Sequence, residues 1–335
     1  MLALTLFAVF FVVALAGVPL LIALLATTFG IIVAAGLGHP LETIVLSFIG
    51  GVEPFILLAV PLFIFAGELL AQGGVGKRIV EFARVLFGWL PGGLGVVTVM
   101  SCTMFGGVSG SAIADTAAIG SLVIPAMVAR GYSRGFAAAL LAVAGTIALL
   151  MPLSIPFLVY AFISGVSMRS LSMAGLLPAI ASALALAAVC VWQGRRTGVD
   201  RGGERSTPAQ IWAATRAAGP ALAMPVIIIG GIWSGLFTPS ESAAIAVVYG
   251  LVVSLFYYRD LDWRRIPQLL LSAFVTSATV MLVIGATGAL AWLITVEQVA
   301  AQMAAWVQVV ATQPWIFLAL FNICLLLLGV FIEPL

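Results

Sequence analysis

The sequence predicts an all-α polytopic membrane protein, and three observations carry this prediction. Of its 335 residues, 63% are hydrophobic and only 8% are charged, which is far more apolar than a soluble core requires. Apolar runs of about 20 residues recur along the whole chain, and this is the length that an α-helix needs to cross a bilayer. The first run has no basic residues before it, so we interpret it as membrane helices and not as a cleaved signal peptide.

Composition also excludes several classes of protein. The net charge of +2 is too small to predict nucleic-acid binding. The three cysteines stand alone in apolar segments, which predicts neither a zinc site nor a disulfide framework. No cluster of His, Asp and Glu side chains predicts a catalytic metal, and we expect no resident cofactor.

The arginine-rich stretch 193–210 is the one clearly polar part of the sequence, and we interpret it as a cytoplasmic linker. It divides the chain into two parts, 1–192 and 211–335. The first part is expected to contain scaffold helices within 1–72 (2–17, 20–36 and 54–72), an amphipathic arm at 75–90, a re-entrant hairpin at 91–129, a broken helix at 135–167 and a helix at 172–192. The second part is expected to contain helices at 216–236, 241–258, 267–293 and 314–330.

The two parts repeat each other at an offset of about 220 residues, so that Pro19 corresponds to Pro239 and Pro91 to Pro314. The arm at 75–90 is basic and should lie on the cytoplasmic face, whereas its counterpart at 296–310 carries only Glu297 and should lie outside. This predicts an inverted-topology repeat, which is typical of transporters, although two apolar halves can also look alike by chance. The second repeat is incomplete, because the sequence stops at Leu335 where its hairpin should turn, so we expect a C-terminal segment to be missing.

Glycines and hydroxyls interrupt a long apolar stretch at 106–111. Non-helical backbone inside a membrane leaves N–H and C=O groups unpaired, at several kcal/mol each, unless protein buries it or it lines a cavity. We therefore expect a re-entrant hairpin whose tip, Ser109-Gly110-Ser111, offers carbonyls, hydroxyls and a helix N-terminus to a small ion or anion.

A second interruption is expected between Gly145 and Pro156. Pro152 and Pro156 each remove a backbone donor and clash with the carbonyl four residues earlier, and Ser154 lies between them. The pattern favours an unwound segment, although an ordinary proline kink also accounts for it. An unwound segment supplies free carbonyls at the depth of the hairpin tip, which predicts an ion site shared by both.

Two polar groups near helix starts have both a structural and a functional interpretation. Asp115 lies one turn into the return arm of the hairpin, where it interacts favourably with the positive helix end, serves the ion site, or does both. Thr238-Pro239-Ser240-Glu241 has the pattern of a capping box, which accounts for all four residues, while Thr238 can also face a substrate.

An enzymatic function is not predicted. Gly107-Val-Ser-Gly110 matches the GxSG pattern of intramembrane serine proteases, but such a serine needs a base within hydrogen-bond reach. The single histidine, His39, is expected in a solvated loop at the outer face and not on a facing helix.

Four motifs of this chain occur together in one family of membrane proteins. They are Pro61-Leu-Phe-Ile-Phe-Ala-Gly-Glu68, Phe105-Gly-Gly-Val-Ser-Gly-Ser-Ala-Ile-Ala-Asp115, the Pro152-Leu-Ser-Ile-Pro156 break and Gly230-Gly-Ile-Trp-Ser-Gly-Leu-Phe-Thr-Pro-Ser-Glu241. Because of these motifs, the chain closely resembles the large membrane subunit of TRAP transporters. The resemblance extends from the N-terminus to Leu335. The chain departs from the family at Leu153, where a second proline is usual, and at Ala112, which is commonly serine.

The resemblance implies the large subunit of a tripartite, sodium-driven importer of organic acids (dicarboxylates, keto acids or sialic acid) in the bacterial inner membrane. A periplasmic binding protein would deliver the substrate, and a small four-helix membrane subunit would brace the permease. An elevator motion would slide the hairpin domain against a static scaffold. Carried onto matching positions, the sodium ligands would be Ser109, Gly110, Ser111, Gly145, Met151 and Ser154. The substrate would contact Ser111, Ala112, Pro152, Ser154 and Thr238, with Asp115 and Glu241 orienting them.

Two other functions stay open at this point. One is a self-sufficient sodium-coupled anion carrier of the ion transporter superfamily, which needs no binding protein. The other is a truncated, non-transporting membrane assembly protein.

Overall fold

A computed structural model describes residues 2–152, 154–310 and 313–331, and these residues form helices without a single strand. The prediction of an all-α chain is confirmed. Among the described residues, six helices are long and apolar enough to cross a membrane, or seven if one bent pair counts as a single span. The chain divides into two compact units, Phe55–Ser277 and a unit made of Met1–Pro54 and Ala278–Leu335.

The unit formed by both ends of the chain consists mainly of short helices that pack around a hydrophobic core. Its core contains Leu6, Ile44 and Leu293, which are almost fully buried. Two glycines, Gly51 and Gly288, let two of these helices approach closely, since a Cβ at Gly288 would lie 3.0 Å from the Gly51 Cα. Its helices are α1 (Leu2–Leu15), α2 (Leu20–Ala34), α3 (Leu41–Val52), the end of α13 (Ile266–Val296), α14 (Val299–Val310) and α15 (Pro314–Phe331).

His39 differs from the prediction of a solvated loop residue. Its ring lies 2.9 Å from the Glu297 carboxylate and packs edge-to-face on Trp292, with only 21% of the side chain exposed. A hydrogen bond to Glu297 and an aromatic neighbour hold the imidazole in place, and both partners are far from His39 in the sequence. The short helix α3 was not predicted either.

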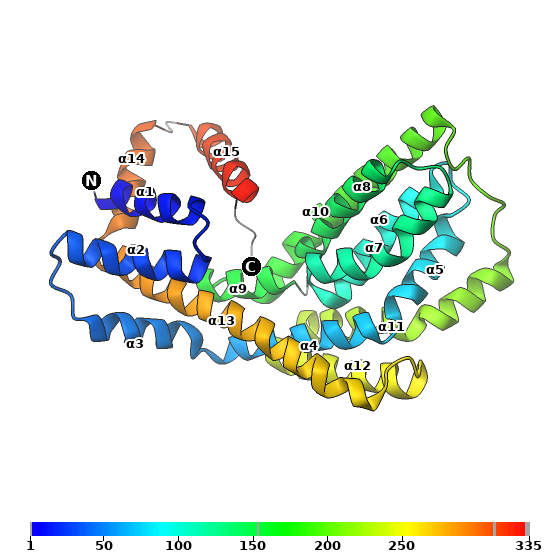
Figure 1. The fold of residues 1–335 in the computed structure, drawn as a ribbon, viewed down its shortest axis with the longest axis horizontal. Coiled ribbons are helices and arrows are strands. Elements are labelled where there is room, and N and C mark those ends of the chain that lie inside the picture. Colours follow the sequence, from blue (N-terminus) through cyan, green and yellow to red (C-terminus); the bar gives the residue numbers. More distant parts are fainter. Residues whose placement is uncertain (1, 153, 311–312, 332–335) are drawn as a thin grey trace. The chain divides into compact units, whose positions relative to one another are not determined.

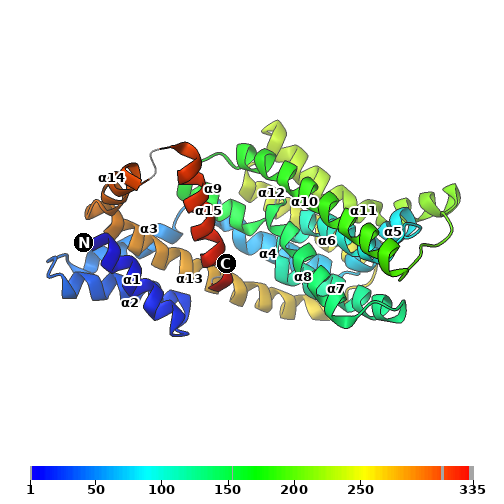
Figure 2. The same ribbon diagram turned by 90° about the horizontal axis from the view of Figure 1, so that it is seen from above.

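The second unit contains the predicted hairpin and broken helix (Figures 1 and 2). Here α12 packs along α4, α11 packs along α5, and α6 contacts α5, α7, α8 and α10. Its helices are α4 (Ala59–Gln72), α5 (Val75–Phe87), α6 (Gly93–Ser109), α7 (Ala112–Ala129), α8 (Arg134–Thr146), α9 (Ile155–Ser164), α10 (Met168–Thr197), α11 (Pro208–Ser234), α12 (Pro239–Val252) and the first part of α13.

Helix ends differ from the predicted ones at the polar linker. Helix α10 continues to Thr197 and α11 begins at Pro208, so only 198–207 of the expected linker 193–210 is non-helical. A capping box at Thr207 and Gln210, followed by proline at the first helical position, starts α11 here. Residues 193–197 and 208–210 of the expected linker belong instead to the ends of α10 and α11.

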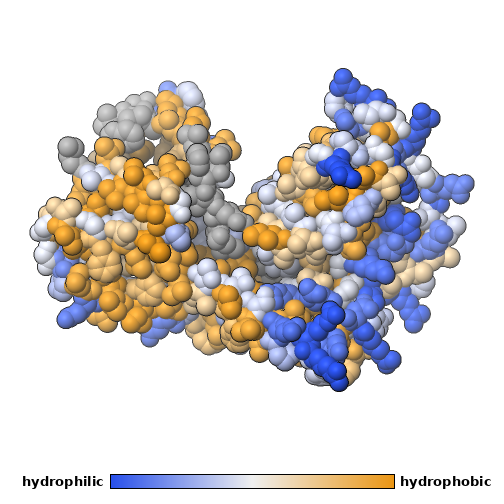
Figure 3. Space-filling model, in the orientation of Figure 1, coloured by the Kyte–Doolittle hydropathy of each residue, from blue (hydrophilic) through white to orange (hydrophobic). Residues whose placement is uncertain are grey.

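The surface of this unit separates apolar from polar regions. Large apolar side chains such as Leu177 and Leu236 are 77% and 74% exposed, as expected of residues that face lipid. In Figure 3 the hydrophilic residues gather over the linker between α10 and α11 and over the turn between α12 and α13. Arg259, Arg264 and Arg265 lie in this second turn. The distribution is that of a multi-pass membrane protein with basic ends.

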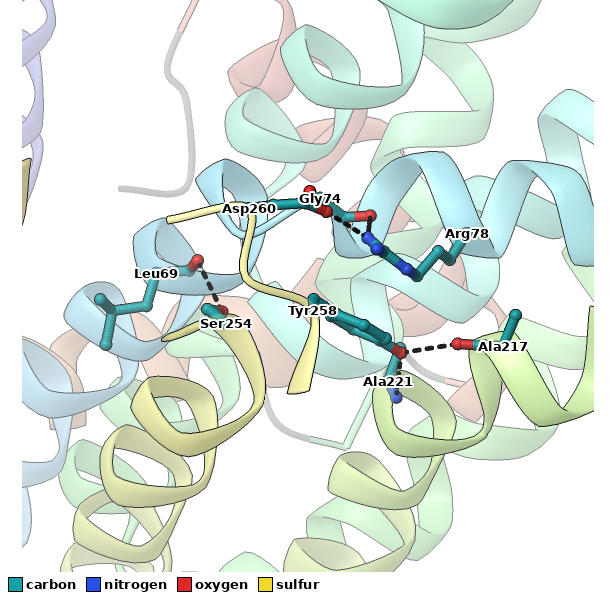
Figure 4. A network of polar contacts seen from close by, with 8 residues as sticks. All are labelled: Leu69, Gly74, Arg78, Ala217, Ala221, Ser254, Tyr258 and Asp260. Atoms are coloured by element: carbon teal, nitrogen blue, oxygen red, sulfur yellow. Dashed lines mark hydrogen bonds and ion pairs between the residues drawn. The ribbon is translucent and has the colours of Figure 1, made fainter. Parts of the chain in front are cut away.

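The corner between α4 and α5 is held by the turn after α12 (Figure 4). The Ser254 hydroxyl donates to the Leu69 carbonyl at 3.3 Å. The Arg78 guanidinium donates to the Gly74 carbonyl at 3.0 Å and to the Asp260 carboxylate at 2.5 Å. Gly74 has a φ of +72°, which glycine adopts without strain.

Tyr258 joins the same corner to α11 (Figure 4). Its ring lies 3.8 Å below the Arg78 guanidinium. Its hydroxyl donates to the Ala217 carbonyl at 2.9 Å and accepts from the Ala221 N–H at 3.2 Å, beside Pro220 inside α11. Burial raises the pKa of Tyr258 to about 12, so the hydroxyl keeps the proton that it donates.

Tyr258→Phe should lower the free energy of unfolding by about 1 kcal/mol, because two backbone groups lose their bridging hydroxyl while the ring stays under Arg78. The measurement is the apparent melting temperature of the purified chain in detergent. Tyr257→Phe is the matched control, since the Tyr257 side chain is 57% exposed. Equal effects of the two substitutions would contradict this account of the corner.

Candidate ion-binding site

The turn between α6 and α7 lies where the sequence predicts the hairpin tip. Helix α6 ends at Ser109, and Gly110 follows with a φ of +63°, a conformation that favours glycine. Ser111 then caps α7, its hydroxyl accepting from the Ala114 N–H at 3.4 Å. The two helices pack against each other and thus form a helical hairpin (Figure 1).

A chain of polar contacts crosses this turn. The Ser111 N–H donates to the Ser109 hydroxyl oxygen at 3.2 Å, and the Ser109 hydroxyl donates to the carboxylate of Asp115. Asp115 is 0% exposed, and its second carboxylate oxygen has no hydrogen-bond partner within the described part of the chain. A buried, half-satisfied carboxylate is unfavourable unless a further group interacts with it.

The predicted break separates α8 from α9. Helix α8 ends at Thr146, a 3₁₀ turn covers Ile147–Leu150, and α9 begins at Ile155 with Ser154 as its cap. The two helices bend by 41°. Ser172 donates its hydroxyl to the Pro152 carbonyl at 3.1 Å, which satisfies one carbonyl freed by the break. Leu153, where the chain departs from the TRAP pattern, lies outside the described residues.

Close glycine contacts place the break directly against the hairpin. A Cβ at Gly106 would lie 2.6 Å from the Ala148 Cα and 3.0 Å from the free oxygen of Asp115. A Cβ at Gly145 would overlap the Thr116 hydroxyl in the first turns of α7. The interruption of α8–α9 and the tip of α6–α7 therefore lie side by side, and they approach so closely that only glycine fits at Gly106 and Gly145.

The predicted site residues fall into two groups. Ser109, Gly110, Ser111, Ala112 and Asp115 lie on the hairpin, and Met151, Pro152 and Ser154 lie on the break that packs against it. Gly145, where the interruption was expected to begin, is still helical and lies at the end of α8. Thr238 and Glu241 instead form the capping box at the exposed start of α12, with the Thr238 N–H donating to Glu241 at 2.8 Å.

Thr238 lies beside a different feature. Its neighbours Phe237 and Pro239 line an open groove of about 440 Å³ together with Phe162 and Arg169 at the junction of α9 and α10. Thr238 therefore lies beside this groove and not beside the tip of the hairpin.

The sequence did not predict the contact between hairpin and break that Gly106, Ala148 and Thr116 make. Gly106 carried a signal, since glycine inside a helix often marks a close approach of two backbones. Among the described residues, no group of three or more His, Cys, Asp or Glu side chains could hold a metal ion. The polar groups gathered near the hairpin tip are instead the hydroxyls of Ser109 and Ser111 and the carboxyl group of Asp115.

Several long apolar helices, one of them interrupted beside a helical hairpin, define a multi-pass membrane protein of the transporter type. Residues 7–335 match the family model of the tripartite ATP-independent periplasmic transporter, DctM component, and the chain belongs to this family.

Three relatives illustrate the match. The C4-dicarboxylate TRAP transporter large permease protein of Rhodobacter capsulatus is 36% identical over 339 residues, covering 94% of this chain and 77% of the relative. The 2,3-diketo-L-gulonate TRAP transporter large permease protein of Escherichia coli is 36% identical over 86% of this chain and 67% of the relative. The isethionate TRAP transporter permease protein DctMQ of Oleidesulfovibrio alaskensis is 36% identical over 98% of this chain and 51% of the relative. These names describe transport subunits, and the protein is a transporter subunit and not an enzyme.

Gly106→Ala should destabilise the contact between hairpin and break by about 1–3 kcal/mol, because the new methyl group meets Ala148 backbone that cannot move freely. Gly135→Ala in α8 is the matched control, since a Cβ there meets nothing within 4 Å. Melting temperatures of both variants in detergent provide the measurement. A Gly106→Ala variant as stable as Gly135→Ala would show that the two segments are not in contact.

Proposed function

We propose that this protein is the large permease subunit of a sodium-coupled, binding-protein-dependent importer of organic acids in the bacterial inner membrane. The observation that carries the proposal is the contact between the hairpin tip and the broken helix, with the half-satisfied Asp115 carboxylate beside it. The tripartite family to which the chain belongs supports two partners: a small four-helix membrane subunit and a periplasmic substrate-binding protein.

The proposed sodium site uses oxygen ligands from both interruptions. Hard cations bind hydroxyl, carbonyl and carboxylate oxygens, and helix breaks at membrane depth expose such carbonyls. The hairpin contributes Ser109, Gly110 and Ser111, and the break contributes Gly145, Met151 and Ser154. Asp115 lowers the cost of bringing a positive ion into this buried position without having to be a ligand itself.

The proposed substrate is an anion, as it is in the names of the relatives. C4-dicarboxylate, isethionate, diketogulonate and sialic acid all carry a negative charge. The starts of α7 and α9, at Ser111 and Ser154, carry the positive ends of the two helix dipoles, which favour a carboxylate or sulfonate. Ala112 and Pro152 would line the same place, with a bound sodium ion adding positive charge.

The proposed mechanism is an elevator motion built on an inverted repeat. The contacts of α6 with α7, α8 and α10, and of α7 with α8, support movement of this group as one body. The basic arm α5 would lie in the cytoplasm, and α14, with Glu297 just before it, would lie outside. Residues 332–335, where the hairpin of the second repeat should turn, lie outside the described residues.

Ser109→Ala and Ser111→Ala should each raise the sodium concentration for half-maximal uptake about fivefold, the effect of losing about 1 kcal/mol of ion binding. The measurement is sodium-driven uptake in proteoliposomes with both partner subunits. Ser121→Ala is the matched control, because this exposed α7 hydroxyl only bonds the Ala118 carbonyl. Unchanged half-saturation in both tip variants would refute the assignment of the sodium site.

Single cysteines introduced at Lys77 and Gln302, both exposed, should react with an impermeant maleimide from opposite sides of the membrane. Labelling in intact cells and after permeabilisation provides the comparison, with Gln302→Cys reacting in intact cells and Lys77→Cys only after permeabilisation. Labelling of both from one side would rule out the inverted topology.

A further inference from the structure

One buried carboxylate outside the ion site has no role in the proposed function. Asp200 lies in the linker 198–207, a polar segment in which neighbouring Arg201, Gly203 and Glu204 are exposed. Only 2% of the Asp200 side chain is exposed. Its backbone has a φ of +51°, a conformation that non-glycine residues seldom adopt and that surrounding contacts must hold.

The hydrogen bonds of Asp200 join it to the base of the hairpin, which is the place where α6 begins and α7 ends. One carboxylate oxygen accepts from the Leu94 N–H at 2.8 Å and from the Tyr132 hydroxyl at 3.3 Å. The other oxygen accepts from the Arg130 guanidinium at 2.7 Å. The Asp200 carbonyl accepts from the Gly92 N–H at 2.8 Å.

These four donors come from both arms of the hairpin. Gly92 and Leu94 belong to the start of α6, where free N–H groups favour a carboxylate. Arg130 and Tyr132 follow the end of α7. A simple cap of α6 would need only a serine or asparagine, whereas one side chain here bonds two chain segments that lie 36 or more residues apart in sequence.

The rest of the linker and the end of α10 reinforce this position. A Cβ at Gly194 would lie 2.5 Å from the Gly92 Cα, so α10 meets the hairpin base backbone to backbone. The Arg205 guanidinium lies 4.4 Å above the Trp89 ring, just before the hairpin. Burial, together with the Asp200 charge, raises the pKa of Tyr132, so its hydroxyl keeps the proton that it donates.

We propose that Asp200 is a positioning residue that fastens the start of α6 to the end of α7 and thereby holds the hairpin tip in its ion-binding geometry. The arms are joined covalently only at the tip, so without a fastening at the base they can slide or splay. The proposal rests on the proposed function in one respect, namely that the tip is the ion site.

The test is hydrogen–deuterium exchange of the full chain in lipid nanodiscs without sodium, read by mass spectrometry in peptides covering the base (92–96) and the tip (105–115). Asp200→Ala should speed exchange roughly tenfold at the base and also, to a smaller degree, at the tip. Asp200→Asn, which keeps an acceptor for Leu94 but loses the charge that faces Arg130, should fall between Asp200→Ala and the unchanged protein. Glu204→Gln, an exposed carboxylate of the same linker, is the matched control and should change neither peptide.

Faster exchange at the base with an unchanged tip would overturn the proposal, since Asp200 would then be a local cap. If Asp200→Ala does not fold, Arg130→Gln gives a readout of the same kind, because the Arg130 side chain is 51% exposed and Asp200 keeps its hydrogen bonds to Gly92, Leu94 and Tyr132. In uptake assays, Asp200→Asn should raise the sodium half-saturation more than it lowers the maximal rate. The exchange result does not depend on sodium, so it stands even if Ser109 and Ser111 prove not to bind the ion.

Discussion

The close approach of the α6–α7 hairpin to the broken helix α8–α9 is the contact on which the rest of this structure depends. It exists because Gly106 and Gly145 carry no side chain where the opposite backbone and the Thr116 hydroxyl lie. Both segments leave backbone groups outside regular helices, which lipid cannot satisfy. Packing the two interruptions against each other buries these groups in protein and gathers their oxygens in one place.

A buried carboxylate interacts with the hairpin at each of its two ends, the tip and the base. At the tip, Asp115 sits in the first turn of α7, bonded to Ser109 and with one oxygen free. At the base, Asp200 bonds both arms through four donors. Two buried carboxylates at opposite ends of one hairpin thus have different roles: the first offers a free oxygen, and the second has its oxygens occupied by hydrogen bonds.

Local patterns predicted the helices, the turn at Gly110, the break before Pro156 and the capping box at Thr238, because each depends on residues within a few positions of one another. The sequence did not predict α3, whose 12 residues between Pro40 and Pro54 are too short for a span. It misplaced His39, whose partner Glu297 is 258 residues away. Asp200 escaped notice for the same reason, since an aspartate in a polar linker looks solvated until distant segments fold against it.

The central claim is that hairpin and break form one ion site, and a double-mutant cycle between Ser109→Ala and Ser154→Ala tests it most directly. Sodium binding to the purified chain is measured as thermal stabilisation against sodium concentration, with choline keeping the ionic strength constant. Two ligands of one ion should give strongly coupled effects, with the double variant losing little more sodium response than the more affected single variant. Independent, additive effects, or a Ser154→Ala variant with normal sodium response, would contradict a shared site.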